Sequence, residues 1–159
     1  MKETILKHQQ YIKDGDWDGF FDAVRGEQFD DATDVEIFQF CLECVPDLLY
    51  KITYIPNNAF YHSDIKSITI PSNIKEIGFA AFAGCENLKS VIIQNGVKAI
   101  DQWAFVECVN LTNIAIPDSV VDIDYTAFED CINLKRISIP KHLEYEDFLP
   151  EDCKIKVRQ

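Results

Sequence analysis

The chain repeats itself every 23 residues, and this repeat constrains the fold more than any other feature of the sequence. Five positions of the unit return unchanged in three consecutive copies, without a gap: Ala81-Phe82, Ala104-Phe105 and Ala127-Phe128; Cys85, Cys108 and Cys131; Asn87-Leu88, Asn110-Leu111 and Asn133-Leu134. Branched aliphatic residues fill further columns at the same spacing. A unit this short cannot bury its own apolar side, so several units must stack. The repeat therefore predicts a solenoid in which each unit forms one coil.

Each unit is expected to contain one strand and one return segment. In one full unit, Leu88, Val91 and Ile93 point inward and alternate with the outward residues Ser90 and Ile92, which is the period of a β-strand. The Ala-Phe-x-x-Cys-x-x-Leu stretch is expected to bring the chain back as a short helical turn. The Asn before each Leu is expected to bond backbone groups at the corner of the coil.

These residues resemble the BspA-like leucine-rich repeats, whose unit reads approximately Ile-Pro-x-x-Val-x-x-Ile-x-x-x-Ala-Phe-x-x-Cys-x-x-Leu-x-x-Ile. Residues 65–140 fit this unit closely, and residues 46–159 fit it if worn terminal units are included, with Ile155 and Val157 in a last strand. The resemblance implies an α/β solenoid, a short right-handed leucine-rich-repeat coil with a parallel sheet on one face, which binds other macromolecules. Family members are often adhesion proteins with export signals and many more repeats. Because this chain shows neither, an adhesion role is not expected.

Residues 1–45 lack the repeat and carry a net charge of −7, against −5 for the rest of the chain. Apolar residues at helical spacing predict three helices, over residues 3–13, around residues 17–24 and from Asp34 onward. The residues expected inward in the first two are Ile5, Leu6 and Ile12, and then Trp17, Phe20, Phe21 and Val24. We predict a helical cap, residues 1–45, that closes the N-terminal end of a solenoid formed by residues 46–159. A separate partner-binding module is the alternative.

The stretch from Asp14 to Gly19 matches the opening D-x-D-x-D-G of an EF-hand calcium loop. The twelfth position of that loop should supply a bidentate glutamate, but here it is Arg25, and a cation at this position opposes calcium binding. The alternative is a turn whose aspartates cap the second helix. We therefore predict no metal site and no cofactor.

The cysteines and histidines do not combine into a predicted active site. The three cysteines of the repeat are expected to be buried, reduced thiols. Cys41 and Cys44 form a C-x-x-C pair on an apolar helix, without a second pair or a nearby histidine to complete four metal ligands. His62, Ser63 and Asp64 are the residue types of a catalytic triad, but neighbours in a chain cannot direct their side chains along one proton path. No catalytic residue is assigned, and an enzyme is not predicted.

Two surfaces are candidates for binding a partner. The first is the outward side of the predicted sheet, where small or mildly apolar residues form two columns: Ser67, Ser90, Asn113 and Arg136; Thr69, Ile92, Ala115 and Ser138. The second lies on the return side and carries large aromatic residues: Phe79, Trp103 and Tyr125. Exposed aromatic residues mark interfaces. The alternatives are a merely solvated sheet, and packing of the aromatic residues between coils, Trp103 in particular.

The net charge of −12 limits the classes of partner. Nucleic-acid backbones and anionic membranes both require a cationic face, so neither is expected. No apolar run predicts a membrane span and no leader predicts export, so a cytoplasmic location is expected. The sequence predicts a non-catalytic module that binds another protein. The alternative is an acidic charge decoy that inhibits a nucleic-acid-binding enzyme by occupying its basic groove.

Overall fold

The computed structural model describes residues 2–14, 16, 19–20, 23–24, 37, 41, 52–143 and 153–158. The chain divides into two compact units, Met1–Thr53 and Tyr54–Gln159, and each is described by itself.

The first unit begins with two short helices, α1 (Lys2–Lys7) and α2 (Gln9–Asp14). They stand where one helix was expected over residues 3–13. Of the residues expected inward, Ile5 and Ile12 are buried, whereas Leu6 is half-exposed. Five more of the described residues of this unit are buried: Phe20, Val24, Ile37, Cys41 and Ile52. Trp17, Phe21 and most of the third expected helix lie outside the described residues, and the cap stays a prediction.

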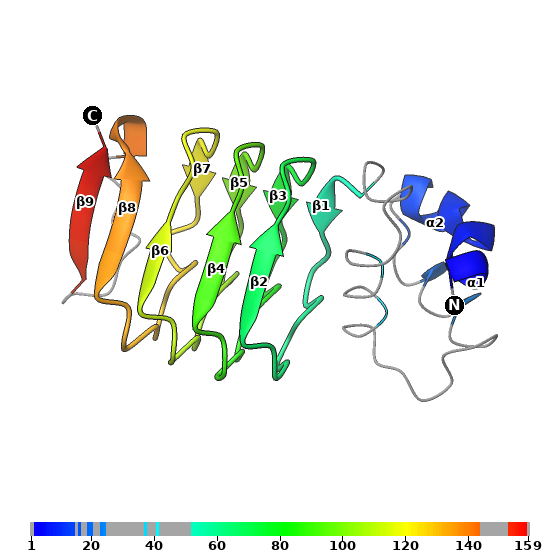
Figure 1. Cartoon of the computed structure of the whole chain (residues 1–159), viewed down its shortest axis with the longest axis horizontal. Coiled ribbons are helices and arrows are strands. Elements are labelled where there is room, and N and C mark those ends of the chain that lie inside the picture. The colour runs from blue at the N-terminus through cyan, green and yellow to red at the C-terminus, as the bar shows by residue number, and fades with distance from the viewer. Residues whose placement is uncertain are drawn as a thin grey trace. The chain divides into compact units, whose positions relative to one another are not determined.

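The second unit is a solenoid of parallel strands that return at the repeat spacing (Figure 1). The longer strands run along one side of the coils: β2 (Ser67–Ile70), β4 (Ser90–Ile93), β6 (Asn113–Ala115), β8 (Arg136–Pro140) and β9 (Lys154–Arg158). Ile68 lies opposite Val91, and Ile137 lies opposite Ile114 on one side and Ile155 on the other. A 3-10 helix, η1 (Lys141–Leu143), follows β8. The expected parallel strands are thus present on this side, the last one included, but hydrogen bonds pair them in two separate sets, β2 with β4 and β6 with β8 and β9.

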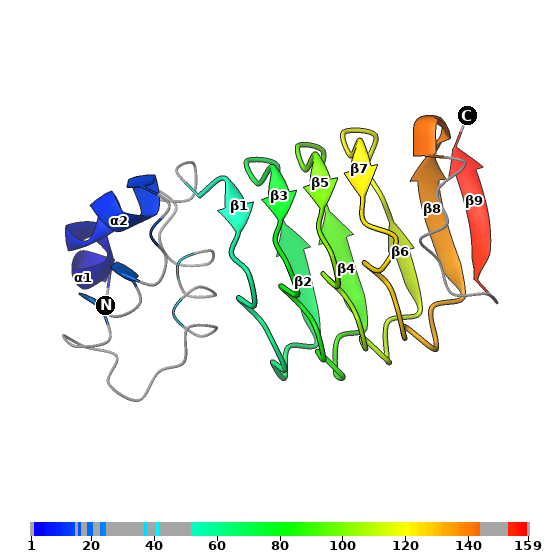
Figure 2. The same ribbon diagram turned by 180° about the vertical axis from the view of Figure 1, so that it is seen from behind.

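A second parallel sheet lies on the other side of the coils, and the sequence did not predict it (Figure 2). Its strands contribute two residues each: β1 (Tyr54–Ile55), β3 (Glu76–Ile77), β5 (Ala99–Ile100) and β7 (Asp122–Ile123). In each pair the isoleucine is buried and the preceding residue faces outward to some degree. Two residues are too few to show a strand period, which explains why the pattern was missed.

The return segment is a run of turns and not the short helical turn that was expected. In a helix, every N–H group would donate to a carbonyl of the same coil. Here only every second N–H group donates within its coil, and the N–H groups between them donate to carbonyls of the next coil. The Phe60 N–H donates to the Ala81 carbonyl at 2.7 Å, and the Phe82 N–H donates to the Ala104 carbonyl at 2.8 Å. The turn segments therefore link successive coils as the strands do.

Left-handed backbone at fixed positions permits this alternation. One column of such residues is His62, Gly84, Glu107 and Asp130, with φ between 53° and 67°. The N–H groups of the first three all donate to carbonyls of the next coil. Left-handed backbone costs a residue with a Cβ about 1–2 kcal/mol, and glycine is spared that cost. Only Gly84 in this column has the residue type that the conformation favours.

A column of stacked phenylalanine rings fills the interior of the solenoid. Phe60, Phe82, Phe105 and Phe128 are fully buried. Successive ring centroids lie 4.8, 5.0 and 5.4 Å apart, and the ring planes differ by 10°, 3° and 1°. The 23-residue repeat thus places each ring on the one before, as the fold requires.

The repeated cysteine and asparagine satisfy polar groups between coils. The thiols of Cys85, Cys108 and Cys131 each lie 2.9–3.2 Å from the carbonyl oxygen of a phenylalanine in the preceding coil. The side-chain amides of Asn110 and Asn133 donate to backbone carbonyls of the preceding coil at 2.7 Å, which confirms the predicted corner role. The equivalent Asn87 donates instead to the Asp64 carboxylate.

We expect Phe105→Ala to lower the free energy of unfolding by about 3–5 kcal/mol, because it removes a ring stacked on both sides and leaves a cavity. Urea denaturation measures this loss. The control is Ile92→Ala, which also shortens an apolar side chain but at an exposed position of β4, and should change stability by less than about 0.5 kcal/mol. Equal losses in the two variants would contradict the buried column.

We expect Glu107→Gly to raise the free energy of unfolding by about 0.5–1 kcal/mol. The substitution removes the strain of a left-handed residue with a Cβ, which exceeds the entropy that glycine adds to the unfolded chain. Glu86→Gly is the matched control, because Glu86 is also an exposed glutamate of the turn segment but has an ordinary negative φ. It should destabilise by about 0.5–1 kcal/mol. The same sign of change in both variants would refute the role of left-handed backbone.

Candidate binding surface

The outward side chains of β2, β4, β6, β8 and β9 form one surface, which we call the sheet face. All eight residues predicted for it lie there, and all are exposed except the half-exposed Ser138. The strand register aligns them in pairs: Ser67 with Ser90 and Thr69 with Ile92 on β2 and β4, and Asn113 with Arg136 and Ala115 with Ser138 on β6 and β8. Most are small, and Ile92, which exposes 56% of its surface, is the one large apolar side chain among the eight.

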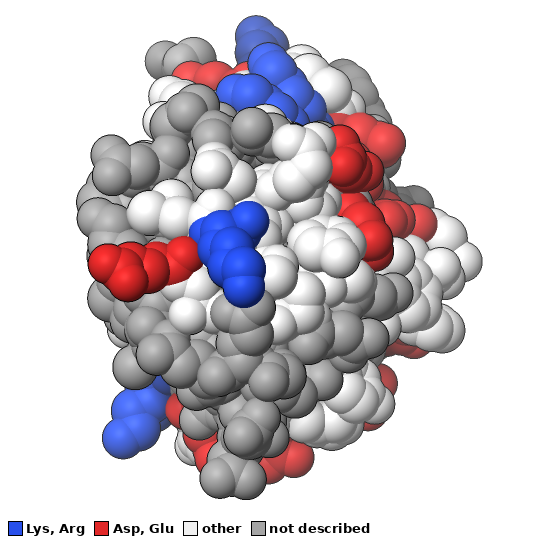
Figure 3. Space-filling model, turned by 90° about the vertical axis from the view of Figure 1, so that its right-hand side faces the viewer, with Lys and Arg blue, Asp and Glu red and all other residues white. Residues whose placement is uncertain are grey.

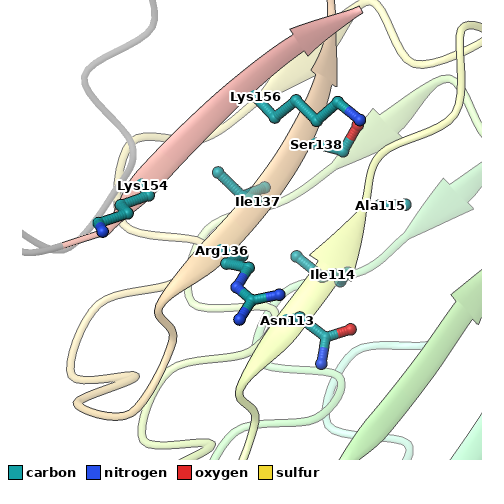
Figure 4. Close-up of a pocket in the computed structure, with 8 residues that line it drawn as sticks. All are labelled: Asn113, Ile114, Ala115, Arg136, Ile137, Ser138, Lys154 and Lys156. Carbon is teal, nitrogen blue, oxygen red and sulfur yellow. The ribbon is translucent and has the colours of Figure 1, made fainter.

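The C-terminal end of the sheet face is hollowed between β6, β8 and β9 (Figure 4). The hollow has a volume of about 450 Å³ and is lined by Asn113, Ile114, Ala115, Arg136, Ile137, Ser138, Lys154 and Lys156. Figure 4 shows Arg136 on β8 beside Asn113 on β6, and Lys156 on β9 beside Ser138 on β8. The register pairs Arg136 with Lys154 and Ser138 with Lys156.

Lys154 and Lys156 are site residues that the sequence analysis missed. β9 follows β8 after 18 residues instead of 23, so it falls outside the repeat register. A signal was nevertheless present. Once Ile155 and Val157 are assigned to a strand with inward side chains, alternation places Lys154 and Lys156 on the outward side.

The three predicted aromatic residues form a less continuous surface. The rings of Phe79 and Trp103 are 5.4 Å apart, whereas no ring contact joins Tyr125 to either of them within the described residues. The Trp103 indole N–H donates to the Glu129 carboxylate at 3.2 Å, and 39% of Trp103 is exposed. Tyr125 is 72% exposed. Trp103 therefore contacts side chains of both neighbouring coils and is also partly exposed, while Tyr125 is available to solvent.

Acidic side chains concentrate away from the sheet face. Exposed acidic residues follow the second sheet and the turn segments: Glu76, Asp101, Glu107, Asp122, Glu129 and Asp130. Figure 3 shows acidic side chains at several places on the face it presents, whereas none of the described outward residues of the sheet face is acidic. The negative charge of the protein is therefore unevenly placed.

The aspartates after α2 include a helix cap. The Asp16 carboxylate accepts a hydrogen bond from the Gly19 N–H at 3.0 Å, which is the geometry of an N-cap and agrees with the alternative to a calcium loop. Asp18, Asp22 and Arg25 lie outside the described residues. Within the described part of the chain, no group of three or more His, Cys, Asp or Glu side chains has a geometry that could hold a metal ion.

The described cysteines are thiols, and those of the repeat are buried. Burial raises the pKa of the Cys85 thiol to about 11. A hydrogen bond with the Cys131 side chain and burial raise the pKa of Cys108 far above its usual range. Burial also raises the pKa of the half-exposed Cys153. These thiols stay protonated near neutral pH, so they are poor nucleophiles. Cys44 lies outside the described residues.

His62, Ser63 and Asp64 take structural roles at a coil corner. The Ser63 hydroxyl accepts from the Ile65 N–H at 3.4 Å, and the Asp64 carboxylate accepts from the Asn87 amide at 3.1 Å. The His62 ring packs edge-on against Tyr61, and it also fills the space beside Gly84 that a Cβ would occupy. The three side chains do not form a nucleophile–base relay with one another.

The helices that are described in this chain are all too short or too polar to cross a membrane.

A known family profile matches most of the chain. The profile of the BspA type leucine-rich repeat region matches residues 53–156 in six copies, so the worn terminal units count as repeats. A comparison with curated proteins finds no match.

Two solved structures that match are also leucine-rich repeat proteins. The protein from Bacteroides capillosus ATCC 29799 is 25% identical, with 68% of this chain and 64% of that chain covered and a TM-score of 0.48. The T. pallidum protein TpLRR is 23% identical, with 67% and 63% covered and a TM-score of 0.49. The chain thus spans less than two thirds of either structure.

We expect iodoacetamide at about pH 8 to modify Cys153 well before the three cysteines of the repeat in the folded protein. The repeat thiols are buried, and burial raises the pKa of Cys85, whereas Cys153 is partly exposed. Peptide mass spectrometry measures each site, and the control is the same reaction in denaturant, where all should react at similar rates. Modification of Cys108 as fast as Cys153 in the folded protein would contradict the buried thiol column.

Proposed function

The chain belongs to the BspA-type leucine-rich repeat family, whose fold generally mediates protein–protein interaction, and we propose that it is a non-catalytic binding module that acts through its sheet face. The observation that carries this proposal is the set of exposed outward side chains along one side of the coils, in register on β2 and β4 and again on β6, β8 and β9. The binding of one protein by another through this surface requires no catalytic group.

The sheet face is suited to binding because it is rigid before a partner arrives. Neighbouring strands lie about 4.8 Å apart, and hydrogen bonds on the strand sides and the turn side of each coil hold that spacing. A preorganised surface loses little conformational entropy on association. The small outward residues Ser67, Ser90 and Ala115 let a partner approach the backbone closely, and Ile92 offers an apolar anchor.

Two alternatives remain as competing proposals. The first places the interface at Tyr125 and its aromatic neighbours, which the exposure of Tyr125 favours. The second is the acidic charge decoy, which would use the exposed carboxylates beside the second sheet and the turns. The aromatic residues and the carboxylates adjoin each other, because Trp103 donates to Glu129, but the sheet face is separate from both, so single substitutions and salt distinguish the three proposals.

We expect Ser90→Arg to reduce capture of the partner at least tenfold, because a long charged side chain in the middle of the sheet face blocks close approach. The full chain serves as bait in extract of the native cell, and quantitative mass spectrometry compares the captured proteins. Val121→Arg is the matched control, because it places the same side chain at an exposed position beside β7 and should leave capture unchanged.

Undiminished capture by Ser90→Arg would overturn the proposal. A loss with Tyr125→Ala instead would move the interface to the aromatic residues. A loss of the partner from the wild-type bait between low and high salt, with both variants unaffected, would favour the decoy.

A further inference from the structure

The hollow at the C-terminal end of the sheet face collects positive charge in a protein whose net charge is −12. Arg136, Lys154 and Lys156 line it, and all three are exposed. Arg136 on β8 lies directly opposite Lys154 on β9. Like charges placed opposite each other on neighbouring strands destabilise a sheet. The arrangement therefore has an electrostatic cost that an anion between the strands would relieve.

The described residues of the sheet face supply no such anion. None of the outward side chains described on β2, β4, β6, β8 and β9 is acidic. Arg158 of β9 forms an ion pair with Asp118 at 2.9 Å, and the same guanidinium also donates to the Ile116 carbonyl. Arg158 thus has an acidic partner within the chain. The positive charge inside the hollow faces outward, toward whatever binds the sheet.

We propose that this hollow binds an extended, carboxylate-rich segment of the protein partner, an inference that rests on the proposed function of the sheet face. Lys154 and Lys156 are two residues apart on one strand, so they repeat at about 6.6 Å. Alternate side chains of an extended segment have the same spacing. The Arg136 guanidinium can donate two parallel hydrogen bonds to one carboxylate, and the neutral side chains of Asn113 and Ser138 add hydrogen-bonding groups.

The size of the hollow and the surrounding charge favour a short acidic segment over a long polyanion. A nucleic acid would extend beyond the cationic hollow and meet a protein that is strongly acidic overall. A segment with a few carboxylates fits within about 450 Å³ of space. It is too short to reach the acidic surface outside the hollow, which would repel it. Because the cations are exposed, each pair contributes modestly, and binding should weaken with salt.

The test titrates the full chain with a synthetic hexapeptide that alternates glutamate and serine, and follows backbone amide shifts by NMR. Shifts confined to β6, β8 and β9, absent with the glutamine–serine peptide, are expected. Lys154→Gln combined with Lys156→Gln should weaken binding about fivefold or more. Lys75→Gln combined with Lys98→Gln is the matched control, because it removes two exposed charges elsewhere on the solenoid and should leave the affinity unchanged.

Three outcomes would overturn this inference: no shifts in the hollow, equal losses in the two double variants, or tighter binding of inorganic phosphate or of an oligonucleotide of equal charge. Partner capture separates it from the proposed function. If the Lys154→Gln, Lys156→Gln variant captures the partner like the wild type while Ser90→Arg does not, the sheet face stands and the acidic segment is refuted. If Ser90→Arg captures the partner normally, the proposed function itself has failed.

Discussion

The solenoid depends on one constraint: the backbone polar groups and the aromatic ring of each coil find their partners mainly in the next coil. Phe82 stacks between Phe60 and Phe105, and its carbonyl accepts the thiol of Cys108. The strands on both sides of the coils and the turn segments add hydrogen bonds between neighbouring coils. A single coil would leave these groups exposed, so stability must arise from nearest-neighbour contacts.

The sequence predicted those features of the fold in which the same residue type has the same role in every repeat. Phe82, Cys108 and Asn110 belong to columns whose chemistry is identical in three units, and their roles follow from stacking. The second sheet had no comparable signal, because its outward positions hold residues as different as Glu76 and Ala99. The left-handed backbone at Glu107 was also unpredictable, since the neighbouring coils impose it against the preference of the residue.

The candidate site shows the same division. Ser90 and Ile92 could be placed on the sheet face because alternation along a strand fixes which side chains point outward. The lysines of β9 were missed because that strand returns early, so a search by repeat spacing passes over them. Their role as neighbours of Arg136 depends on register between strands, and the chain reveals that register only when folded. Pairing of this kind is where the structure adds most to the sequence.

The distribution of charge changes what the net charge implies about partners. A value of −12 suggests repulsion of all anions, yet an approaching group experiences the local field of the surface that it meets. Because the strand register brings Arg136, Lys154 and Lys156 together, the end of the sheet face is locally cationic. The acidic residues beside the second sheet and the turns repel long polyanions without preventing a short carboxylate segment from entering the hollow. Net charge thus limits the size of the anionic partner, while the register of β8 and β9 determines where it can bind.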